Sequence, residues 1–478
     1  MVEDEEKPRS KLYVFEPLIH RLPEVAVPKR HVAFKERFLW TGVALVLFFI
    51  MIQIPLYGMV GEPGSFFGYL RYVLASHAGS IMELGIGPIV TAGIIMQLLV
   101  GGKIIKLDMS DPDDRALFTG VQKILAIVMA IFEAVMLVFG GWYDPTRFAQ
   151  VAGAPPPQPL STGTNIFLIV QLVLGAVVVI YLDELVSKYG FGSGVSLFIA
   201  GGVAGEIVWR AFTPVASAQY AGQMIGAIPN FIRAMISGSS TQIGDAFTRS
   251  NLPNIMTVFA TLIVFFIVVY AESLRVEIPL AYGQYGGMRG RYPIKFLYTS
   301  NIPVILAMTV FANVKIIASL LARAGYTFLG TVSPASGLVY YLEPPSGIAS
   351  VTADPLRAVI YLVILVVVCI GFAWLWVQMT GMGPRDVAQQ LQDSGLSIPG
   401  FRRDIRVMGW VLDRYIKTVT IMSGAFVGVL AALADFMGAL GSGTGILLTV
   451  GIIYGLYEEI ARERVSEMFP AVRRLFGE

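Results

Sequence analysis

The sequence has one cysteine, Cys369, and only three histidines among its 478 residues. A single cysteine excludes an intramolecular disulfide, and Cys369 lies inside an apolar run. His20, His31 and His77 are far apart in the sequence, and none adjoins a cluster of cysteine or acidic residues. We therefore expect no metal site and no cofactor.

Charged residues are also scarce. Asp, Glu, Lys and Arg make up 14% of the chain, whereas hydrophobic residues make up 55%; soluble domains carry about 25% charged residues. The formal net charge of +2 indicates little about partners. The N-terminus MVEDEEKPRSK is charged and lacks the basic-then-apolar pattern of a cleaved signal. The composition predicts a membrane protein that inserts through its first hydrophobic segment.

Motifs for covalent chemistry or energy supply are missing as well. The sequence holds no Walker-type phosphate loop, so energy for any transport must come from outside the chain. GFGSG, at 190–194, is faintly similar to a nucleophile turn but lacks the strand–turn–helix context. An intramembrane protease would need paired catalytic groups, and Asp183 and Asp435 are expected at helix ends on opposite membrane faces.

Long apolar runs predict ten transmembrane helices, and an even number places both termini on one side. Most Lys and Arg residues fall in the N-terminal arm, the even-numbered links and the C-terminal tail. The positive-inside rule therefore predicts cytoplasmic termini. The runs cover roughly residues 39–60, 84–101, 117–140, 164–183, 193–210, 254–271, 300–322, 356–380, 416–434 and 443–460.

The predicted fold class is an all-α polytopic membrane protein with two pseudo-symmetric halves of five helices each. We expect a cytoplasmic N-terminal arm at 1–38, an N-terminal half at 39–210, an external linker at 211–253, a C-terminal half at 254–460 and a cytoplasmic tail at 461–478.

Residues 84–97, LGIGPIVTAGIIMQ, form a short apolar run interrupted by three glycines and a proline. An amphipathic stub at 64–80 precedes the run and is too short and too polar to span a bilayer. Irregular backbone at membrane depth is tolerated where it lines a water-filled path. Residues 300–320 form the second helix of the other half and also carry an early proline, which suggests an inverted repeat around such a path.

Two predicted cytoplasmic links are longer than turns. The link at 271–300 is predicted to contain two strands joined by a turn-rich tip, and the link at 381–417 a short amphipathic helix followed by the turn PGFRR. Two basic loops on one face favour an anionic or acidic partner, such as ribosomal RNA or an acidic ATPase surface. The plainer alternative is that their arginines only satisfy the positive-inside rule.

Several long runs occur in order along the chain. They are LGIGPIVTAGIIMQLLVGGKII, IYLDELVSKYGFGSGVSLFIA, VVYAESLRVEIPL, RYPIKFLYTSNIPVILA, PGFRR and SGAFVGVLAALADFMGALGSGTGILLTVGIIYGLYEE, together with LPEVAVP at 22–28. In these runs the chain resembles the SecY protein-conducting channel family in its archaeal form. The resemblance extends from about residue 20 to the C-terminus, although the links at 211–253 and 325–350 match only loosely.

The resemblance implies a pore narrowed by a ring of aliphatic side chains and closed by the stub at 64–80 as a plug helix. A ring of branched aliphatic side chains resists ions because it dewets, and it offers a moving chain no fixed hydrogen bond. By motif position the pore ring consists of Ile86, Val90, Val195, Ile199, Ile305 and Leu448. The bland alternative for each residue is ordinary helix packing.

The resemblance also implies a lateral gate to lipid with a polar cluster of Thr91, Glu133 and Asn301. Glu133 lies well inside an apolar run, where a carboxyl group is costly unless paired or protonated. A helix–helix polar clasp without a gating role is the alternative.

The implied function is the central subunit of the Sec translocation channel in the cell membrane, conducting unfolded polypeptides across it and releasing transmembrane segments sideways into lipid, without enzymatic chemistry. Implied partners are a SecE-like subunit, an archaeal beta-type subunit, the ribosome, signal sequences, nascent polypeptides and membrane lipid. Implied ribosome-docking residues are Arg289, Arg291, Arg402 and Arg403.

A secondary transporter with broken helices is the main rival interpretation. Such a carrier usually needs several ionisable residues near the bilayer midplane. Glu133 is the clearest one here, while Lys315 and Asp435 are expected near helix ends. The sequence therefore favours a channel without an ion relay.

Overall fold

The structure is a computed structural model of the chain, and most of it is helical. A helix satisfies its backbone hydrogen bonds internally, which makes it the expected form of apolar segments in lipid. The structure describes residues 11–30, 32–58, 74–102, 104–105, 107, 111–140, 143, 161–217, 223–249, 252–282, 289–331, 335–345, 347–393, 396–397 and 405–468.

The chain divides into two compact units, and each is described by itself. Unit 1 comprises the described parts of 1–198, 312–332 and 459–478, and unit 2 those of 199–311 and 333–458. Unit 1 holds η1 (Lys11–Phe15), α1 (Glu16–Ile19), α2 (Phe34–Gln53), α4 (Gly87–Gly101), α5 (Pro112–Phe139) and α6 (Thr162–Tyr189).

Unit 2 holds most of α7 (Gly194–Phe212) and the first part of α11 (Ile302–Arg323), whose remainder belongs to unit 1. It also holds α8 (Ala227–Ser237), α9 (Ser240–Thr248), α10 (Ile255–Ser273), β1 (Arg275–Tyr282), β2 (Arg289–Lys295), α12 (Gly337–Leu342), α13 (Gly347–Ala353), α14 (Pro355–Met379), α15 (Pro384–Asp393), β3 (Leu396–Ser397), α16 (Ile405–Phe436) and most of α17 (Gly443–Met468).

The chain is a multi-pass membrane protein. Within the described residues, nine helices are long and apolar enough to cross a membrane: α2, α5, α6, α7, α10, α11, α14, α16 and α17. A helix also forms in the second predicted run, but α4 has only 15 residues, a length of about 22 Å. The count of ten spanning helices therefore stays a prediction.

Several predicted boundaries were wrong. The first helix ends at Gln53 instead of continuing to 60, because Pro55 disfavours helix at the residue before it and Ile54 is extended. The ninth predicted run lies inside α16, which begins at Ile405, within the expected cytoplasmic link. The linker at 211–253 contains α8 and α9, which the sequence analysis did not predict.

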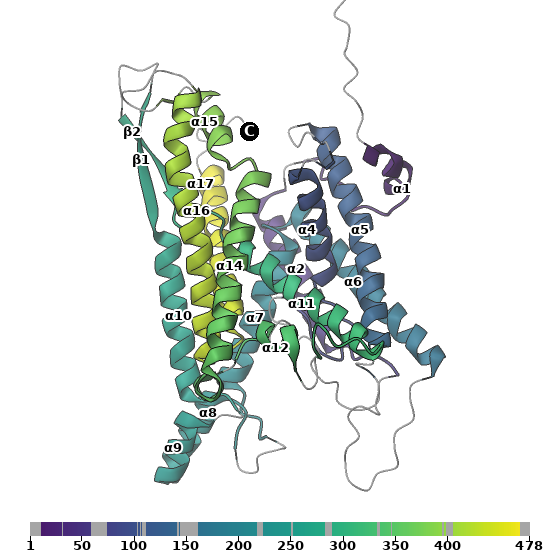
Figure 1. The fold of residues 1–478 in the computed structure, drawn as a ribbon, viewed down its shortest axis with the longest axis vertical. Coiled ribbons are helices and arrows are strands. Elements are labelled where there is room, and N and C mark those ends of the chain that lie inside the picture. Colours follow the sequence, from purple (N-terminus) through teal and green to yellow (C-terminus); the bar gives the residue numbers. More distant parts are fainter. Residues whose placement is uncertain are drawn as a thin grey trace, which may run out of the picture. The chain divides into compact units, whose positions relative to one another are not determined.

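Unit 1 is built around α5 and α6. Helix α4 packs against α5, α5 against α6, and α6 against α2 (Figure 1). Gly175 of α6 lies directly against the main chain of Ile81, since a Cβ atom at this glycine would lie 2.1 Å from the Ile81 carbonyl oxygen. The segment that leads into α4 is thus held on the surface of α6.

Unit 2 is built on the pair α14 and α16, which lie side by side with α10 next to α16 (Figure 1). Gly424 and Gly428 are one helical turn apart on α16, so both face α14. A Cβ atom at Gly428 would lie 2.9 Å from the Val366 Cα, and one at Gly424 would lie 3.0 Å from the Ile370 Cα. Small residues at this spacing allow two helix backbones to approach closely in a membrane.

The two long links form one small sheet. Strands β1 and β2 pair antiparallel with Arg275 opposite Lys295, and β3 pairs with the end of β1, giving the order β2-β1-β3. The predicted strands and the short helix α15 are confirmed. The sequence analysis missed β3, which joins the second link to the first.

The glycine contact between α14 and α16 predicts a clear stability difference. We expect Gly428→Ala to lower the stability of the protein by about 1–3 kcal/mol, because the added methyl group overlaps the α14 backbone. Gly371→Ala, on α14, is the control, because a Cβ atom at Gly371 meets nothing within 4 Å. Thermal unfolding in detergent measures both variants, and equal unfolding temperatures would contradict the close packing.

Candidate functional site

Thr91 of α4 and Glu133 of α5, both predicted as gate residues, contact each other in unit 1. The Thr91 hydroxyl donates to Glu133 Oε1 at 3.3 Å, and Asn313 of α11 donates from Nδ2 to Thr91 Oγ1 at 3.1 Å. Glu133 is 2% exposed and Thr91 is 6% exposed. Gly87 leaves room for the carboxylate, because a Cβ atom there would lie 3.1 Å from Glu133 Oε2. One polar chain therefore joins α11, α4 and α5.

The sequence analysis missed Asn313. It lies in the middle of an apolar helix, so the rule that singled out Glu133 also applies to its amide. The predicted gate residue Asn301 lies in unit 2, where its Nδ2 donates to the Leu447 carbonyl oxygen of α17 at 3.1 Å. A part for Asn301 in a gate stays a prediction.

The predicted pore-ring residues all lie in the first two turns of a helix or at its N-cap. Ile86 is the N-cap of α4 and Val90 follows it by one turn, while Val195 lies at the start of α7; these three belong to unit 1. Ile199, Ile305 of α11 and Leu448 of α17 belong to unit 2. Ile86, Ile199 and Leu448 are fully buried.

Each of these four helices begins one or two residues after a residue with positive φ. Gly85 precedes α4, Gly192 precedes α7, Ser300 precedes α11 and Ser442 precedes α17, with φ between 53° and 67°. The left-handed conformation is uncommon and costly for a serine. Two of the four turns therefore need neighbouring contacts to hold them.

Asp183 and Asp435 cap two of these helices. Asp183 Oδ1 accepts a hydrogen bond from the Val195 N–H at 2.8 Å, and Asp435 Oδ1 accepts one from the Gly443 N–H at 2.7 Å. Asp435 lies near the end of α16 as predicted, whereas Asp183 lies inside α6, which continues to Tyr189. Both carboxylates satisfy backbone N–H groups at a helix start, as capping residues do.

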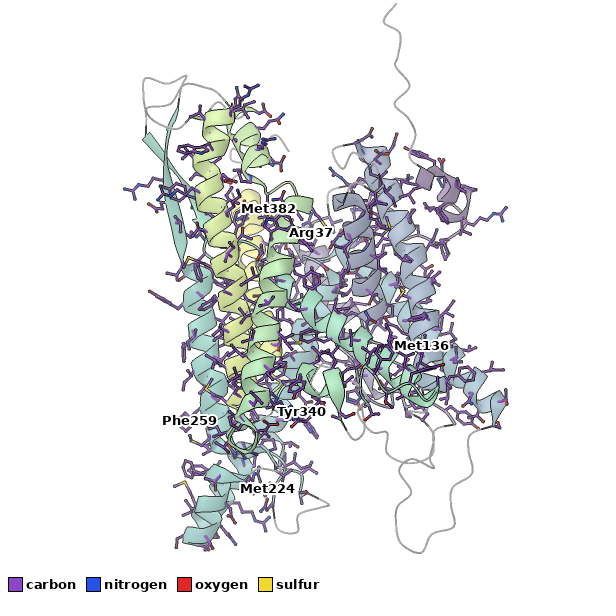
Figure 2. The ribbon with its side chains drawn as sticks, viewed as in Figure 1. Arg37, Met136, Met224, Phe259, Tyr340 and Met382 are labelled. Atoms are coloured by element: carbon purple, nitrogen blue, oxygen red, sulfur yellow. The ribbon has the colours of Figure 1, made fainter. Side chains whose placement is uncertain are left out.

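The turn before α11 is tied to α16, to α17 and to the link before α15. The Tyr298 hydroxyl donates to the Met382 carbonyl oxygen at 2.8 Å. Met382 lies just before α15 (Figure 2). Burial raises the pKa of Tyr298 to about 12, so the hydroxyl stays protonated well above neutral pH. Thr299 and Ser423 of α16 share a hydrogen bond of 3.3 Å, and Asn301 binds the Leu447 carbonyl of α17.

Residues 64–73 of the predicted plug lie outside the described residues, but its last part packs against the start of α4. The Ile86 N–H donates to the Leu74 carbonyl oxygen at 2.8 Å, and Leu74 is 2% exposed. A Cβ atom at Gly85 would lie 2.1 Å from the same carbonyl oxygen, so only glycine fits there. Glu83 accepts a hydrogen bond from the Gly79 N–H, which closes the turn between them.

Of the predicted docking arginines, the structure describes the side chain of Arg291. It is exposed on β2 and forms an ion pair with Glu277 of β1. Exposed ion pairs contribute little to stability. Arg289 lies in β2 opposite Ala281, and Arg402 and Arg403 lie outside the described residues.

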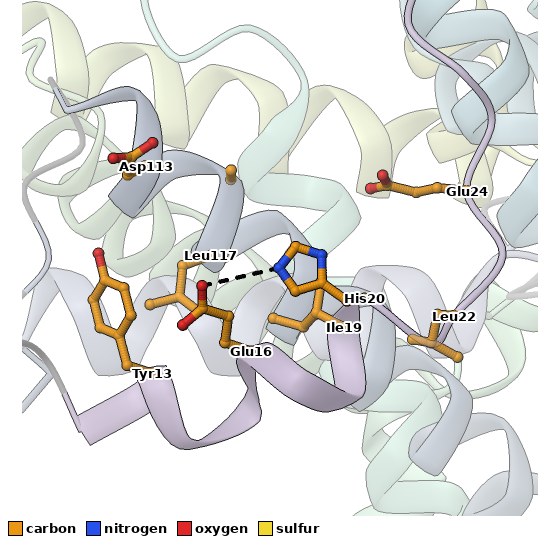
Figure 3. Close-up of a pocket in the computed structure, with 9 residues that line it drawn as sticks. Tyr13, Glu16, Ile19, His20, Leu22, Glu24, Asp113 and Leu117 are labelled. Atoms are coloured by element: carbon orange, nitrogen blue, oxygen red, sulfur yellow. Dashed lines mark ion pairs between the residues drawn. The ribbon is translucent and has the colours of Figure 1, made fainter.

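A surface recess of about 580 Å³ lies where the N-terminal segment rests on α5 (Figure 3). Tyr13, Glu16 and His20 line one side, and Asp113 and Leu117 of α5 line the other. It includes none of the predicted site residues. In the part of the chain that the structure describes, no group of three or more His, Cys, Asp or Glu residues is placed to hold a metal.

Lys315 was expected near a helix end, but it lies inside α11 and is 2% exposed. The predicted run at 300–322 nearly matches α11, Ile302–Arg323, so the bounds of the helix were right and the position of Lys315 near its end was wrong. A buried lysine in a spanning segment is costly unless it is paired.

Known proteins match this chain over nearly its whole length. The SecY family model matches residues 80–457. The protein translocase subunit SecY of Pyrococcus furiosus is 48% identical, covering 95% of this chain and 97% of that protein. The same subunit of Methanothermobacter thermautotrophicus is 47% identical, covering 97% of this chain and 98% of that protein.

Solved structures give the same result. A structure described as that of a protein conducting channel matches with a TM-score of 0.81 and 43% identity, covering 96% of this chain and 99% of that one. Sec61 in the canine ribosome–channel complex from the endoplasmic reticulum matches with a TM-score of 0.78 and 42% identity, covering 96% of this chain and 99% of that one. The predicted all-α polytopic fold and the predicted family are thereby confirmed, and the chain belongs to the SecY family of protein translocase subunits.

Proposed function

We propose that this chain is the central subunit of a protein translocation channel that conducts unfolded polypeptides across the membrane and releases transmembrane segments into lipid. The observation that carries the proposal is the end-to-end match with protein translocase subunits and with a protein-conducting channel. A secondary transporter is not favoured, because both matches are to translocation channels. The function involves binding and passage, without covalent chemistry.

The pore ring of this proposal consists of Ile86, Val90, Val195, Ile199, Ile305 and Leu448. All six are aliphatic and lie at or near the beginnings of α4, α7, α11 and α17. A narrow aliphatic constriction excludes ions by dewetting. Each of these helices starts directly after a tight turn. The turn fixes the backbone that carries the ring side chains.

The gate of this proposal is held by the polar chain from Asn313 through Thr91 to Glu133. Hydrogen bonds between membrane helices contribute about 0.6–2 kcal/mol each. A hydrophobic signal helix gains roughly 0.3–0.6 kcal/mol for each apolar residue that it places in lipid. Several such residues therefore outweigh the two hydrogen bonds, and the signal helix opens the gate.

The channel lies in the cell membrane with both termini in the cytoplasm, as the distribution of Lys and Arg supports. The sheet β2-β1-β3 and α15 then form a cytoplasmic platform that bears Arg289 and Arg291, with Arg402 and Arg403 in the segment after β3. The similar Sec61 chain was solved in a ribosome–channel complex. The platform accordingly docks on the ribosome, and small SecE-like and archaeal beta-type subunits complete the channel.

Replacing ring residues with glycine is expected to raise the ion conductance of the idle channel. Glycine at Ile86, Ile199 and Leu448 together removes the side chains that keep the constriction dry. Conductance in planar bilayers measures the leak. Glycine at Val128, Val170 and Val363, which are exposed positions on spanning helices, is the control. Equal conductance of the ring variant and the control would refute the role of the pore ring as a barrier to ions.

A signal sequence held in mid-transit is expected to crosslink to both sides of the gate. A photoreactive or thiol-reactive signal segment should react with cysteine at Thr91 or Asn313. Cysteine at Phe259, on the exposed apolar face of α10, should remain unreacted (Figure 2). Gel analysis of the crosslinked products measures the reaction. Equal labelling at all three positions would indicate general contact with lipid and count against a lateral gate.

Arg402→Glu is expected to weaken ribosome binding about fivefold. This change in Kd corresponds to a loss of about 1 kcal/mol of binding free energy. Reversing the charge replaces attraction to phosphate with repulsion. Cosedimentation with ribosomes at fixed salt measures the affinity. Arg233→Glu changes the same charge in the predicted external linker, and it should bind like the unmodified chain. An Arg402→Glu protein with normal affinity would remove this residue from the docking surface.

A further inference from the structure

Gly451 of α17 lies at a contact that the functional proposal does not use. A Cβ atom at Gly451 would lie 1.9 Å from Asn301 Nδ2 and 2.9 Å from Glu272 Oε1. Asn301 is 4% exposed and Glu272 is 5% exposed. The absence of a side chain at this single position lets an amide from the turn before α11 and a carboxyl from the end of α10 reach the backbone of α17.

The space beside Gly451, bounded by Asn301 and Glu272, is called the niche here. The Asn301 amide lies in it and binds the backbone of α17. Its Nδ2 donates to the Leu447 carbonyl oxygen, the residue directly before the ring residue Leu448. The main-chain carbonyl of Asn301 accepts from the N–H groups of Val304 and Ile305 in the first turn of α11. One residue therefore contacts the backbone beside both ring residues.

The turn that carries Asn301 is strained and tied on several sides. Ser300 has φ of 53°, a left-handed conformation that side chains other than glycine disfavour. Tyr298, Thr299 and Asn301 each bond to a different part of unit 2: the link before α15, α16 and α17. Strained backbone persists where its surroundings determine it, and such positions cluster where geometry matters for function.

Two acceptor atoms remain in the niche. Within the described part of the chain, Asn301 Oδ1 and Glu272 Oε1 are buried and have no hydrogen-bond partner. Native structures rarely leave buried polar atoms in this state unless the position has another use. The niche therefore keeps two unpaired polar atoms against Gly451 at the expense of stability.

We propose that Asn301 and Gly451 form a latch between α11 and α17 that sets the spacing of the pore-ring residues Ile305 and Leu448. The proposal rests on the function proposed above, because these residues form a ring only in a channel. Asn301 acts through the backbone and is a positioning residue. Glu272 fills the second side of the niche.

A disulfide-formation assay on the full-length chain in native membrane vesicles tests the latch. Every variant carries Cys369→Ala together with Ile305→Cys and Leu448→Cys, and the rate of oxidative crosslinking reports the spacing of these two positions. Gly451→Ala is expected to change the rate about twofold or more, the smallest effect typical of residues in direct contact. Gly455→Ala, one turn further along α17, should leave the rate unchanged, because a Cβ atom there meets nothing within 4 Å.

A double-mutant cycle identifies the partner. If the methyl group acts by displacing Asn301, Gly451→Ala has no further effect on the rate once Asn301→Ala is present. An equal effect in both backgrounds, or equal rates for Gly451→Ala and Gly455→Ala, would overturn the latch. If Gly451→Ala does not accumulate, Asn301→Ala alone decides, and an unchanged rate overturns the proposal.

Idle ion leak separates a latch from a purely structural contact. In chains without added cysteines, Gly451→Ala should raise leak above that of Gly455→Ala, whatever loss of unfolding temperature the displaced Asn301 hydrogen bond brings. A lowered unfolding temperature without leak would overturn the positioning role. The crosslinking rate does not depend on transport. A ring-glycine variant that fails to leak would therefore refute the pore ring as a barrier to ions, while the latch would still be tested by the spacing of Ile305 and Leu448.

Discussion

Starting a helix inside an apolar segment leaves backbone N–H groups that need partners, and the site of this protein depends on how those groups are satisfied. Asp183 and Asp435 supply carboxylate oxygens that accept from N–H groups at the starts of α7 and α17. At the entry to α4 the acceptor is the Leu74 carbonyl oxygen. The proposed pore residues follow within two turns. The capping groups thus fix the starts of three of the four helices that carry the proposed pore residues, and in the proposed channel the ring follows from where these helices begin.

Close approach at glycine is the second constraint. Lipid gives helices no hydrophobic reason to associate, so association depends on packing and polar contacts. Gly424 and Gly428 bring α16 against α14, and Gly175 accepts the main chain of Ile81. At Gly451 the same absence of a side chain admits polar groups to a helix backbone. A glycine that lets another group approach a helix backbone closely thus serves helix packing at some positions and the binding of polar groups at Gly451.

The polar groups in the spanning helices fall into two kinds. Asn313, Thr91 and Glu133 link three helices of unit 1 through side chains alone. Asn301, Asp183 and Asp435 bind backbone N–H or C=O groups at helix starts. Bonds between side chains exchange partners at little cost, whereas bonds to backbone fix a turn. A gate suits the first kind, and a fixed constriction suits the second.

Hydropathy and motif order by themselves determined the membrane class, the approximate positions of the long apolar helices, the two longer strands of the small sheet and the family. These features depend on local composition, because an apolar run in lipid has few alternatives to a helix. Tertiary structure alone decided that Asn313 joins Thr91, that Asn301 binds α17, that Asp183 caps the next helix and that β3 joins the two links. The partners are 222 residues apart for Asn313 and Thr91 and 146 for Asn301 and Leu447. Partners at such separations are set by packing, which hydropathy does not encode.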